Sequence, residues 1–236
     1  MDIVDKLTEI FKEFPGIGER QAKRFVYFLM SKNGSYAENL ALLITDLKKE
    51  VAQCGECFRF FIVPARNAES IAPAGGKNGK NPVNGGINKT CDICGNTSTD
   101  SSVLMVVEKD SDLESVKKSR VYNGKYFILG GLVPIVEKNT KSKIRIEELK
   151  EKIMREARPN ANALGLASRN ALQEIILAFS VSPQGNHTDS YVREQIKNVA
   201  DKQNIKISSL GKGLSTGTEL EYSDNDTLKN ALKNRQ

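Results

Sequence analysis

Four cysteines limit how this chain can fold, because they form two C-x-x-C pairs, Cys54–Cys57 and Cys91–Cys94, and the sequence has no others. Each pair places two thiolates on one side of a tight turn, and two pairs complete the sulfur set of a tetrahedral zinc ion. A redox C-x-x-C and unrelated thiols are the alternatives, but two pairs with no cysteine left over favour zinc. Since sulfur takes all four positions, none stays open for water, and we predict one structural zinc per chain.

The remaining composition is that of a globular protein, with 39% hydrophobic and 27% charged residues. The longest apolar runs, such as Ile175–Phe179, are far too short to span a bilayer. The chain opens with Met1–Lys6, which lacks the basic start and apolar stretch of a secretory signal. We therefore expect a cytoplasmic protein with reduced thiols and no membrane partner.

The net charge of +6 permits a polyanionic partner, but the excess of positive charge is spread along the chain. Residues 1–63 hold 9 Lys/Arg and 9 Asp/Glu, and residues 91–236 hold 22 and 19. If the chain binds DNA, the binding must therefore depend on the local geometry of a site and not on a basic domain.

The N-terminal region has the apolar spacing of helices over residues 3–14, 19–31 and 36–51. Pro15–Gly18 separates the first two with a tight turn. Residues 14–25 match the helix-hairpin-helix pattern, in which glycines let the turn approach a phosphate and the next helix offers free N–H groups. The pattern predicts sequence-independent DNA binding through five residues: Gly16, Gly18, Arg20, Lys23 and Arg24. Alternatively, the turn only packs helices, or it packs against another copy of the motif in an oligomer.

The second half of the sequence alternates strands and helices, which is typical of a parallel sheet with helices on its faces. We expect strands over residues 103–107, 126–129, 174–179 and 205–210, and helices over residues 111–119, 147–156, 188–202 and 227–233. Residues 64–89 are rich in Gly, Asn, Pro and Ala and read as a flexible insertion. The Lys run at 138–152 is expected to be a solvated surface.

In this order of motifs the chain resembles the RecR family of recombination proteins, with a helix-hairpin-helix, C-x-x-C…C-x-x-C and a Toprim-type α/β domain. Val106–Glu108, Gly124–Gly131 and Glu174–Ala178 resemble the first three Toprim strands, and Gly211–Tyr222 resembles the family's C-terminal signature. The expected fold is therefore a multi-domain α+β protein. Its predicted parts are a helical domain (1–53), a four-cysteine zinc finger (54–97), a Toprim-type domain (98–210) and a C-terminal segment (211–236) that contacts another subunit. The insertions at 64–89 and 155–172 depart from the family.

Toprim enzymes use a Glu and an Asp-x-Asp, hard oxygen ligands of the kind that Mg²⁺ needs. Glu108 could supply the first, but the loop predicted after residue 179 has Gln184 and Asn186 where family members carry glutamates. Asp189 could compensate, although an Asp at a helix start is commonly just a partner of the helix dipole. We therefore expect no catalytic residues and no enzyme activity. His187, the single histidine, is expected in the loop.

The resemblance implies a recombination mediator in DNA repair that clamps DNA as a dimer or tetramer ring and works with RecO and RecF to load the recombinase. The alternatives are a metal-dependent Toprim enzyme and an adaptor that binds only proteins. The sequence leaves open the oligomeric state, the preference for single- or double-stranded DNA, and the roles of the insertions and of Glu108.

Overall fold

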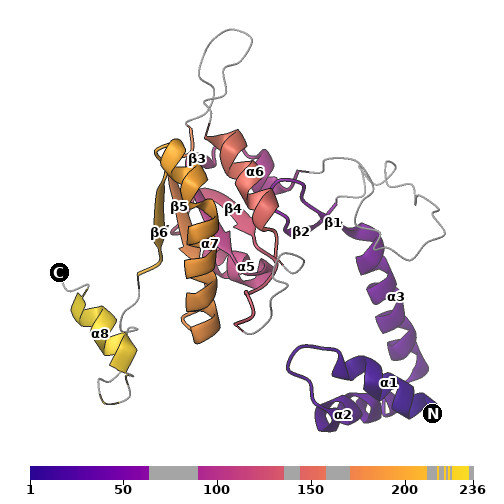
Figure 1. The fold of residues 1–236 in the computed structure, drawn as a ribbon. Helices are drawn as coiled ribbons and strands as arrows, with labels where there is room; N and C mark the ends of the chain where they lie inside the picture. Colours follow the sequence, from indigo (N-terminus) through magenta and orange to yellow (C-terminus); the bar gives the residue numbers. More distant parts are fainter. Residues whose placement is uncertain are drawn as a thin grey trace. The chain divides into compact units, whose positions relative to one another are not determined.

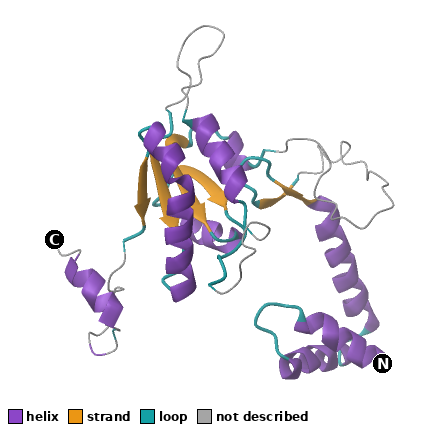
Figure 2. Ribbon diagram, viewed as in Figure 1, coloured by secondary structure: helices purple, strands orange, loops and turns teal. Residues whose placement is uncertain are grey.

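The computed structural model describes residues 1–63, 90–135, 144–157 and 171–211, residues 217, 221 and 223, and the helix α8 (Asn225–Lys233). Figure 1 shows these elements, and Figure 2 shows their secondary structure. The insertion expected at 64–89, most of that at 155–172 and most of the C-terminal signature lie outside the described residues. Within the described part of the chain, no helix has the length and apolarity needed to cross a bilayer.

The chain divides into two compact units, and the described part of the first consists of Met1–Val51 with Ile62 and Val63. It contains three helices, as predicted: α1 (Ile3–Lys12), α2 (Glu19–Met30) and α3 (Gly34–Glu50). Asp2 caps α1 in a reciprocal capping box with Asp5, and Asn33 caps α3 through the N–H of Tyr36. The rings of Phe11 and Phe25 join α1 to α2, with centroids 5.8 Å apart.

The cysteines lie beside or within two short strands and one helical turn: β1 (Val51–Gln53), β2 (Phe60–Ile62) and α4 (Asp92–Gly95). β1 pairs with β2 in a two-stranded sheet. The sequence predicted none of these three elements, and the third helix was expected to continue to Val51, which instead begins β1. Three-residue strands are too short to show a hydrophobic period.

The second unit is built on a parallel four-stranded sheet with the strand order β4-β3-β5-β6, which confirms the predicted fold class. Its strands are β3 (Asp100–Val107), β4 (Gly124–Ile128), β5 (Glu174–Ala178) and β6 (Lys206–Ser209). The helices that connect them are α5 (Asp110–Ser119), α6 (Ile146–Glu156) and α7 (Pro183–Lys202).

Alternate residues of the sheet face two separate apolar cores, as the period of a strand requires. Leu104, Val106 and Phe127 pack with residues of α6 and α7 on one face. Met105 and Ile128 pack with Leu113 of α5 on the other. Helices therefore cover both faces of the sheet, α6 and α7 on one and α5 on the other (Figure 1).

Helix α7 begins at Pro183, five residues before the predicted start, so the expected loop position of His187 is wrong. The hydroxyl oxygen of Ser182 accepts the N–H of Gly185, and Pro183 occupies the first turn, where its missing N–H costs nothing. The sequence Pro-Gln-Gly has the composition of a loop, but a Cβ at position 185 would collide with the carbonyl oxygen of Ser180. Glycine is therefore needed for close packing at this helix start.

Candidate metal centre and nucleic-acid interface

The four cysteines lie together, although 33 residues separate the two pairs along the chain. Cys54 and Cys57 belong to the turn between β1 and β2, Cys91 precedes α4, and Cys94 lies within it. All four are buried, none forms a disulfide, and their sulfur atoms lie within 4.8 Å of one another. The Sγ atoms of Cys57 and Cys91 are 3.6 Å apart. A tetrahedral ion with metal–sulfur bonds of about 2.3 Å separates its ligands by about 3.8 Å, so the cluster fits one such ion.

The surroundings of Cys54 favour a thiolate, the form that binds a metal. Backbone N–H groups of Glu56 and Cys91 donate to its Sγ, each at 3.4 Å. Hydrogen bonds from the thiols of Cys57, Cys91 and Cys94 hold the pKa of Cys54 well below its ordinary value. Four protein ligands complete a tetrahedral shell, so the centre is suited to a structural metal and not to a metal that activates water.

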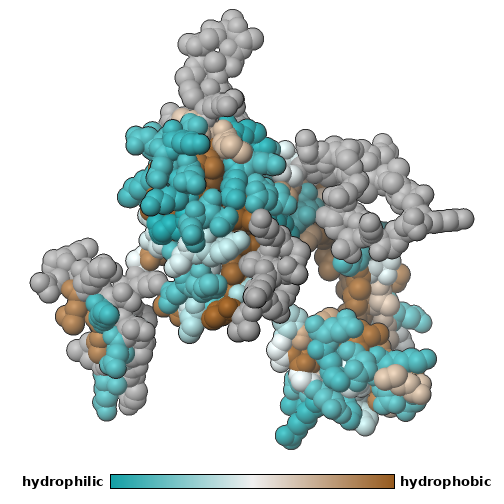
Figure 3. All heavy atoms as spheres, in the orientation of Figure 1, coloured by the Kyte–Doolittle hydropathy of each residue, from teal (hydrophilic) through white to brown (hydrophobic). Residues whose placement is uncertain are grey.

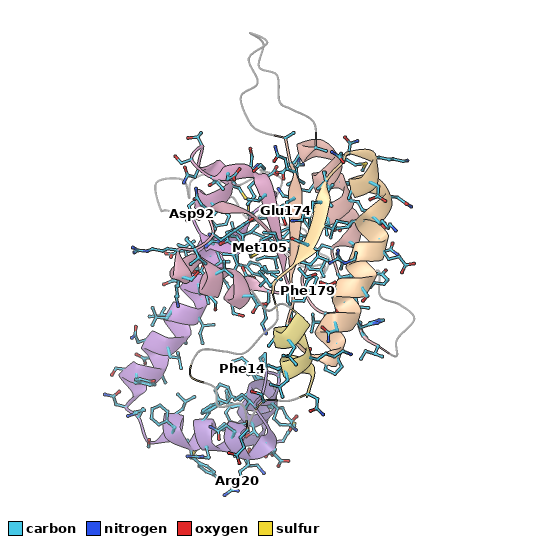
Figure 4. All side chains as sticks on the ribbon, turned by 90° about the vertical axis from the view of Figure 1, so that its left-hand side faces the viewer. Phe14, Arg20, Asp92, Met105, Glu174 and Phe179 are labelled. Carbon is cyan, nitrogen blue, oxygen red and sulfur yellow. The ribbon has the colours of Figure 1, made fainter. Side chains whose placement is uncertain are left out.

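A buried arginine links both C-x-x-C turns, the first knuckle (Cys54–Cys57) and the second knuckle (Cys91–Cys94), to helix α5. The side chain of Arg59 is 10% exposed, and its guanidinium donates to Asp92 at 2.8 Å and to Glu114 at 3.0 Å. Lys117 of α5 also pairs with Asp92, at 3.0 Å. Asp92, labelled in Figure 4, follows directly after Cys91, so these ion pairs hold the second knuckle against the sheet domain.

A second polar network joins the first knuckle to helix α6. Lys152 is 2% exposed, so for this residue the expected solvated surface is wrong. Its Nζ lies 2.8 Å from Glu156 and 3.4 Å from Glu56, and the Nζ of Lys125 lies 3.1 Å from the same Glu156 oxygen. Arg155 also pairs with Glu56. This network was not predicted from the sequence, although Lys152 is next to the buried Ile153 on the apolar side of α6, a position that could have drawn attention to it.

Burial and ion pairing oppose each other in this network. Burial lowers the pKa of Lys152, but the carboxylates of Glu156 and Glu56 raise it by more, and the net shift is upward. Burial likewise raises the pKa of Glu156, and the ammonium groups of Lys152 and Lys125 lower it by more. Both groups are therefore charged at neutral pH.

The turn between α1 and α2 has an exposed backbone at the start of α2. Gly16 has a φ of +78°, a left-handed conformation that other residues adopt only with strain. Gly18 is the N-cap of α2 and makes no side-chain capping bond. The first N–H groups of α2 therefore lack a side-chain acceptor from the cap. A Cβ on either glycine would meet nothing within 4 Å, so the turn is open around both residues.

The three predicted cationic residues of this turn are exposed on α2 and lie at positions i, i+3 and i+4, which share one face of a helix. Arg20 extends away from the helix into solvent (Figure 4). Lys23 pairs with Glu19 at 2.7 Å, and Arg24 contacts the side-chain oxygen of Gln21 at 3.5 Å. Ala22 and Val26, on the other side of α2, are buried. The five residues predicted to bind DNA thus lie at one exposed end of the hairpin.

The strand ends where a Toprim enzyme would hold Mg²⁺ carry few carboxylates. Glu108 follows β3 and has Lys109 3.9 Å away. Gln184 and Asn186 lie exposed in the first turn of α7. Asp189 pairs with Arg193 at 3.4 Å and accepts from Ser209 at 2.6 Å. Among the described residues, the four cysteines are the only group of three or more His, Cys, Asp or Glu side chains close enough to share a metal ion.

Comparison with known proteins gives matches along the whole chain. Residues 102–211 match the family model of the Toprim domain, and residues 213–236 match the model described as RecR, C-terminal. The "Recombination protein RecR" of Legionella pneumophila (strain Corby) is 28% identical over 235 residues, covering 100% of this chain and 98% of that protein. The protein of the same name from Bacteroides thetaiotaomicron is 28% identical, covering 99% and 93%. That from a Cyanothece species is 27% identical, covering 98% and 94%.

Proposed function

The chain belongs to the RecR family of recombination proteins, and from this membership we propose that it is a DNA-binding mediator of recombination and repair without enzymatic activity of its own. The observation that carries the proposal is the start of α2. There, uncapped N–H groups, two glycines and three exposed cations meet at one turn.

This turn is suited to phosphate and not to bases. The N–H groups and the positive end of the helix dipole attract an anion, and the cations one turn further can pair with neighbouring phosphates. Such contacts carry no base readout, so binding is independent of sequence and strongly dependent on salt. The residues in these roles are Gly16, Gly18, Arg20, Lys23 and Arg24.

One hairpin touches only a few phosphates, so we propose that several copies act on one DNA molecule. Linking copies raises the effective concentration of the second and later hairpins. Helix α3 supports such an assembly, because none of its residues is buried and its apolar side chains gather on its surface (Figure 3). The exposed side chains of α3 include Leu43, Ile44 and Leu47, at 60%, 56% and 55%. A dimer or tetramer ring that clamps DNA would cover them, with the C-terminal segment 211–236 as a further contact.

We further propose that the four cysteines hold zinc, one ion per chain. Cys54, Cys57, Cys91 and Cys94 would all be ligands, and the ion would stabilise the fold of the two knuckles. Reduced thiols held by a metal suit the cytoplasm, where we place the protein. RecO and RecF are the protein partners we propose, with loading of the recombinase as the shared task.

A nuclease, topoisomerase or primase is the rival function. Against it stand the neutral Gln184 and Asn186 and the pairing of Asp189 with Arg193, which leave Glu108 without the second carboxylate that Mg²⁺ chemistry needs. The test incubates the purified protein with single- and double-stranded DNA of unrelated sequences, with and without Mg²⁺ or Mn²⁺. We expect binding to all sequences, no cleavage or synthesis, and a solution mass above that of one chain. Activity that disappears in Glu108→Gln would refute the proposal, and absence of DNA binding at low salt would leave only the adaptor.

A further inference from the structure

The interior next to the first knuckle holds an unbalanced positive charge. The Nζ atoms of Lys125 and Lys152 both contact the same oxygen of Glu156, at 3.1 and 2.8 Å. These side chains are 10%, 3% and 12% exposed, in that order. Two buried ammonium groups and one buried carboxylate sum to +1, and an uncompensated charge in the interior is strongly unfavourable.

Glu56 does not neutralise this charge by itself. Its side chain is 38% exposed, so water weakens its attraction to Lys152, which lies 3.4 Å away. Its carboxylate is also bound by Arg155, whose side chain is 57% exposed. The exposed Glu56–Arg155 pair is neutral as a unit, and the excess of +1 stays with the buried groups.

A metal bound by the four cysteines would form an anionic centre beside these buried groups, which could compensate their excess positive charge. A divalent ion with four thiolates has a net charge of −2. Glu56 lies within the first knuckle, between Cys54 and Cys57, so its contact with Lys152 places the ammonium group beside the cluster.

The cations on the other side of the centre have no such excess. Arg59 and Lys117 face Asp92 and Glu114, so this set sums to zero, and its two carboxylates are 63% and 44% exposed. Among the ion pairs of the described residues beside the centre, the excess positive charge therefore lies on the side of α6.

We propose that Lys152 is the charge partner of the metal–tetrathiolate centre, and that the buried excess which it forms with Lys125 and Glu156 holds the divalent ion in place. The inference rests on the proposed metal site and adds to it a positioning residue outside the ligand set. Partners that surround a metal's ligands commonly change metal affinity by about 10- to 100-fold when they are removed.

The test varies the buried charge in steps and measures how fast the metal leaves. The charges of the buried groups at positions 125, 152 and 156 sum to +1 in the parent, to 0 in Lys152→Met and to +2 in Glu156→Gln. Each protein is loaded with Co²⁺, whose absorption spectrum reports a tetrahedral thiolate site, and release to an excess of chelator is followed at neutral pH. Lys150→Met is the matched control, because it removes a cation from the same helix that contacts Glu147 and Gln195 instead. Circular dichroism establishes that each variant is folded.

We expect release to be at least about tenfold faster in Lys152→Met, unchanged in Lys150→Met, and no faster than the parent in Glu156→Gln. The direction in which Glu156→Gln changes the release rate distinguishes an electrostatic effect from a packing effect. This variant weakens the fold but raises the buried positive charge, so only an electrostatic effect would keep release as slow as in the parent. Faster release in Glu156→Gln, or unchanged release in Lys152→Met, would overturn the proposal. If Lys152→Met does not fold, the sign in Glu156→Gln still decides. A parent that gives no thiolate–cobalt spectrum would instead refute the metal site itself.

Discussion

The backbone N–H of Ile128 donates a hydrogen bond of 2.9 Å to the carbonyl oxygen of Cys57, so a predicted metal ligand continues the edge of the parallel sheet. The next residue, Phe58, packs edge-on against Phe127 with ring centroids 5.4 Å apart, and Arg145 lies over its ring at 5.3 Å. The cysteine cluster is therefore built into the sheet domain at strand β4.

Loss of the metal should loosen strand β4 along with the knuckles. In Cys91→Ser, or after treatment with a strong chelator, we expect a lower melting temperature, because metal-binding energy at such a site is folding energy. Amide hydrogen exchange checks the location: the Ile128 amide should exchange faster, while amides of the central strand β5 change less. Equal acceleration in both strands would mean that the metal stabilises the unit only globally.

Replacing Arg59 with Met should destabilise the second unit by about 2 kcal/mol, since two charged hydrogen bonds from a buried guanidinium disappear. The loss stays moderate because Asp92 and Glu114 are largely solvated and are not left as buried charges. Lys117→Met, which removes a more exposed partner of Asp92, should cost under about 1 kcal/mol. Urea unfolding of the metal-loaded proteins measures both, and equal costs would show that burial of Arg59 adds nothing.

Glu156 should contribute to stability at neutral pH and lose that contribution in acid. Its pKa in the folded protein lies below the ordinary value of 4.5, so its contribution is present above that value and is lost as the pH falls through the lower folded pKa. The difference in unfolding free energy between the parent and Glu156→Gln should therefore be constant above about pH 5 and shrink below pH 4.5. A gap that widens in acid would mean that the carboxyl is protonated in the folded state.

The main elements followed from local patterns. The apolar run Val103–Val107 predicted a strand buried on both faces, and the structure places it in the middle of the sheet as part of β3. The amphipathic spacing of α1 and α2 and the Pro-Gly turn between them were equally local signals. The four-part division of the chain and the DNA-binding residues stay predictions.

Features that depend on tertiary contacts could not be predicted in this way. The buried position of Lys152 depends on the carboxylate of Glu156, one helical turn away, and on that of Glu56, which is 96 residues distant in the sequence. The start of α7 looked like a loop because Pro183, Gln184 and Gly185 have loop composition, and only the close approach of Ser180 explains the glycine. The order β4-β3-β5-β6 likewise depends on which strands pair, which hydrophobic periods do not specify.

Charged substitutions on the apolar side of α3 should dissociate the proposed oligomer. Leu43→Glu with Leu47→Glu places carboxylates where a second copy would bury leucines that are 60% and 55% exposed in one chain. We expect the solution mass to fall, as measured by analytical ultracentrifugation, with helicity unchanged. Thr45→Glu is the control, because it adds a carboxylate to an exposed position that faces away from Leu43 and Leu47 on the helix. An unchanged mass in the double variant would exclude this face of α3 as the contact.

Two sets of changes in the hairpin and one at the end of α3 should have different effects on DNA affinity. Lys23→Ala with Arg24→Ala removes two phosphate contacts, so we expect weaker binding to every sequence. The slope of the logarithm of affinity against the logarithm of salt concentration should become shallower by about 1 per lost contact. Lys48→Ala with Lys49→Ala removes the same charge from the end of α3 and should have little effect. Glu19→Gln should instead strengthen binding, because Glu19 holds Lys23 at 2.7 Å and competes with phosphate for its ammonium group.

Fluorescence anisotropy with a labelled oligonucleotide at several salt concentrations measures both affinity and salt dependence. The result for Glu19→Gln is the most informative, since a general loss of structure cannot increase affinity. If Lys23→Ala/Arg24→Ala and Lys48→Ala/Lys49→Ala weaken binding equally, only net charge matters and the turn is not the contact. If neither does, the hairpin serves to pack against another subunit, and the basic insertion with Arg66, Lys77, Lys80 and Lys89 becomes the next candidate for the DNA site.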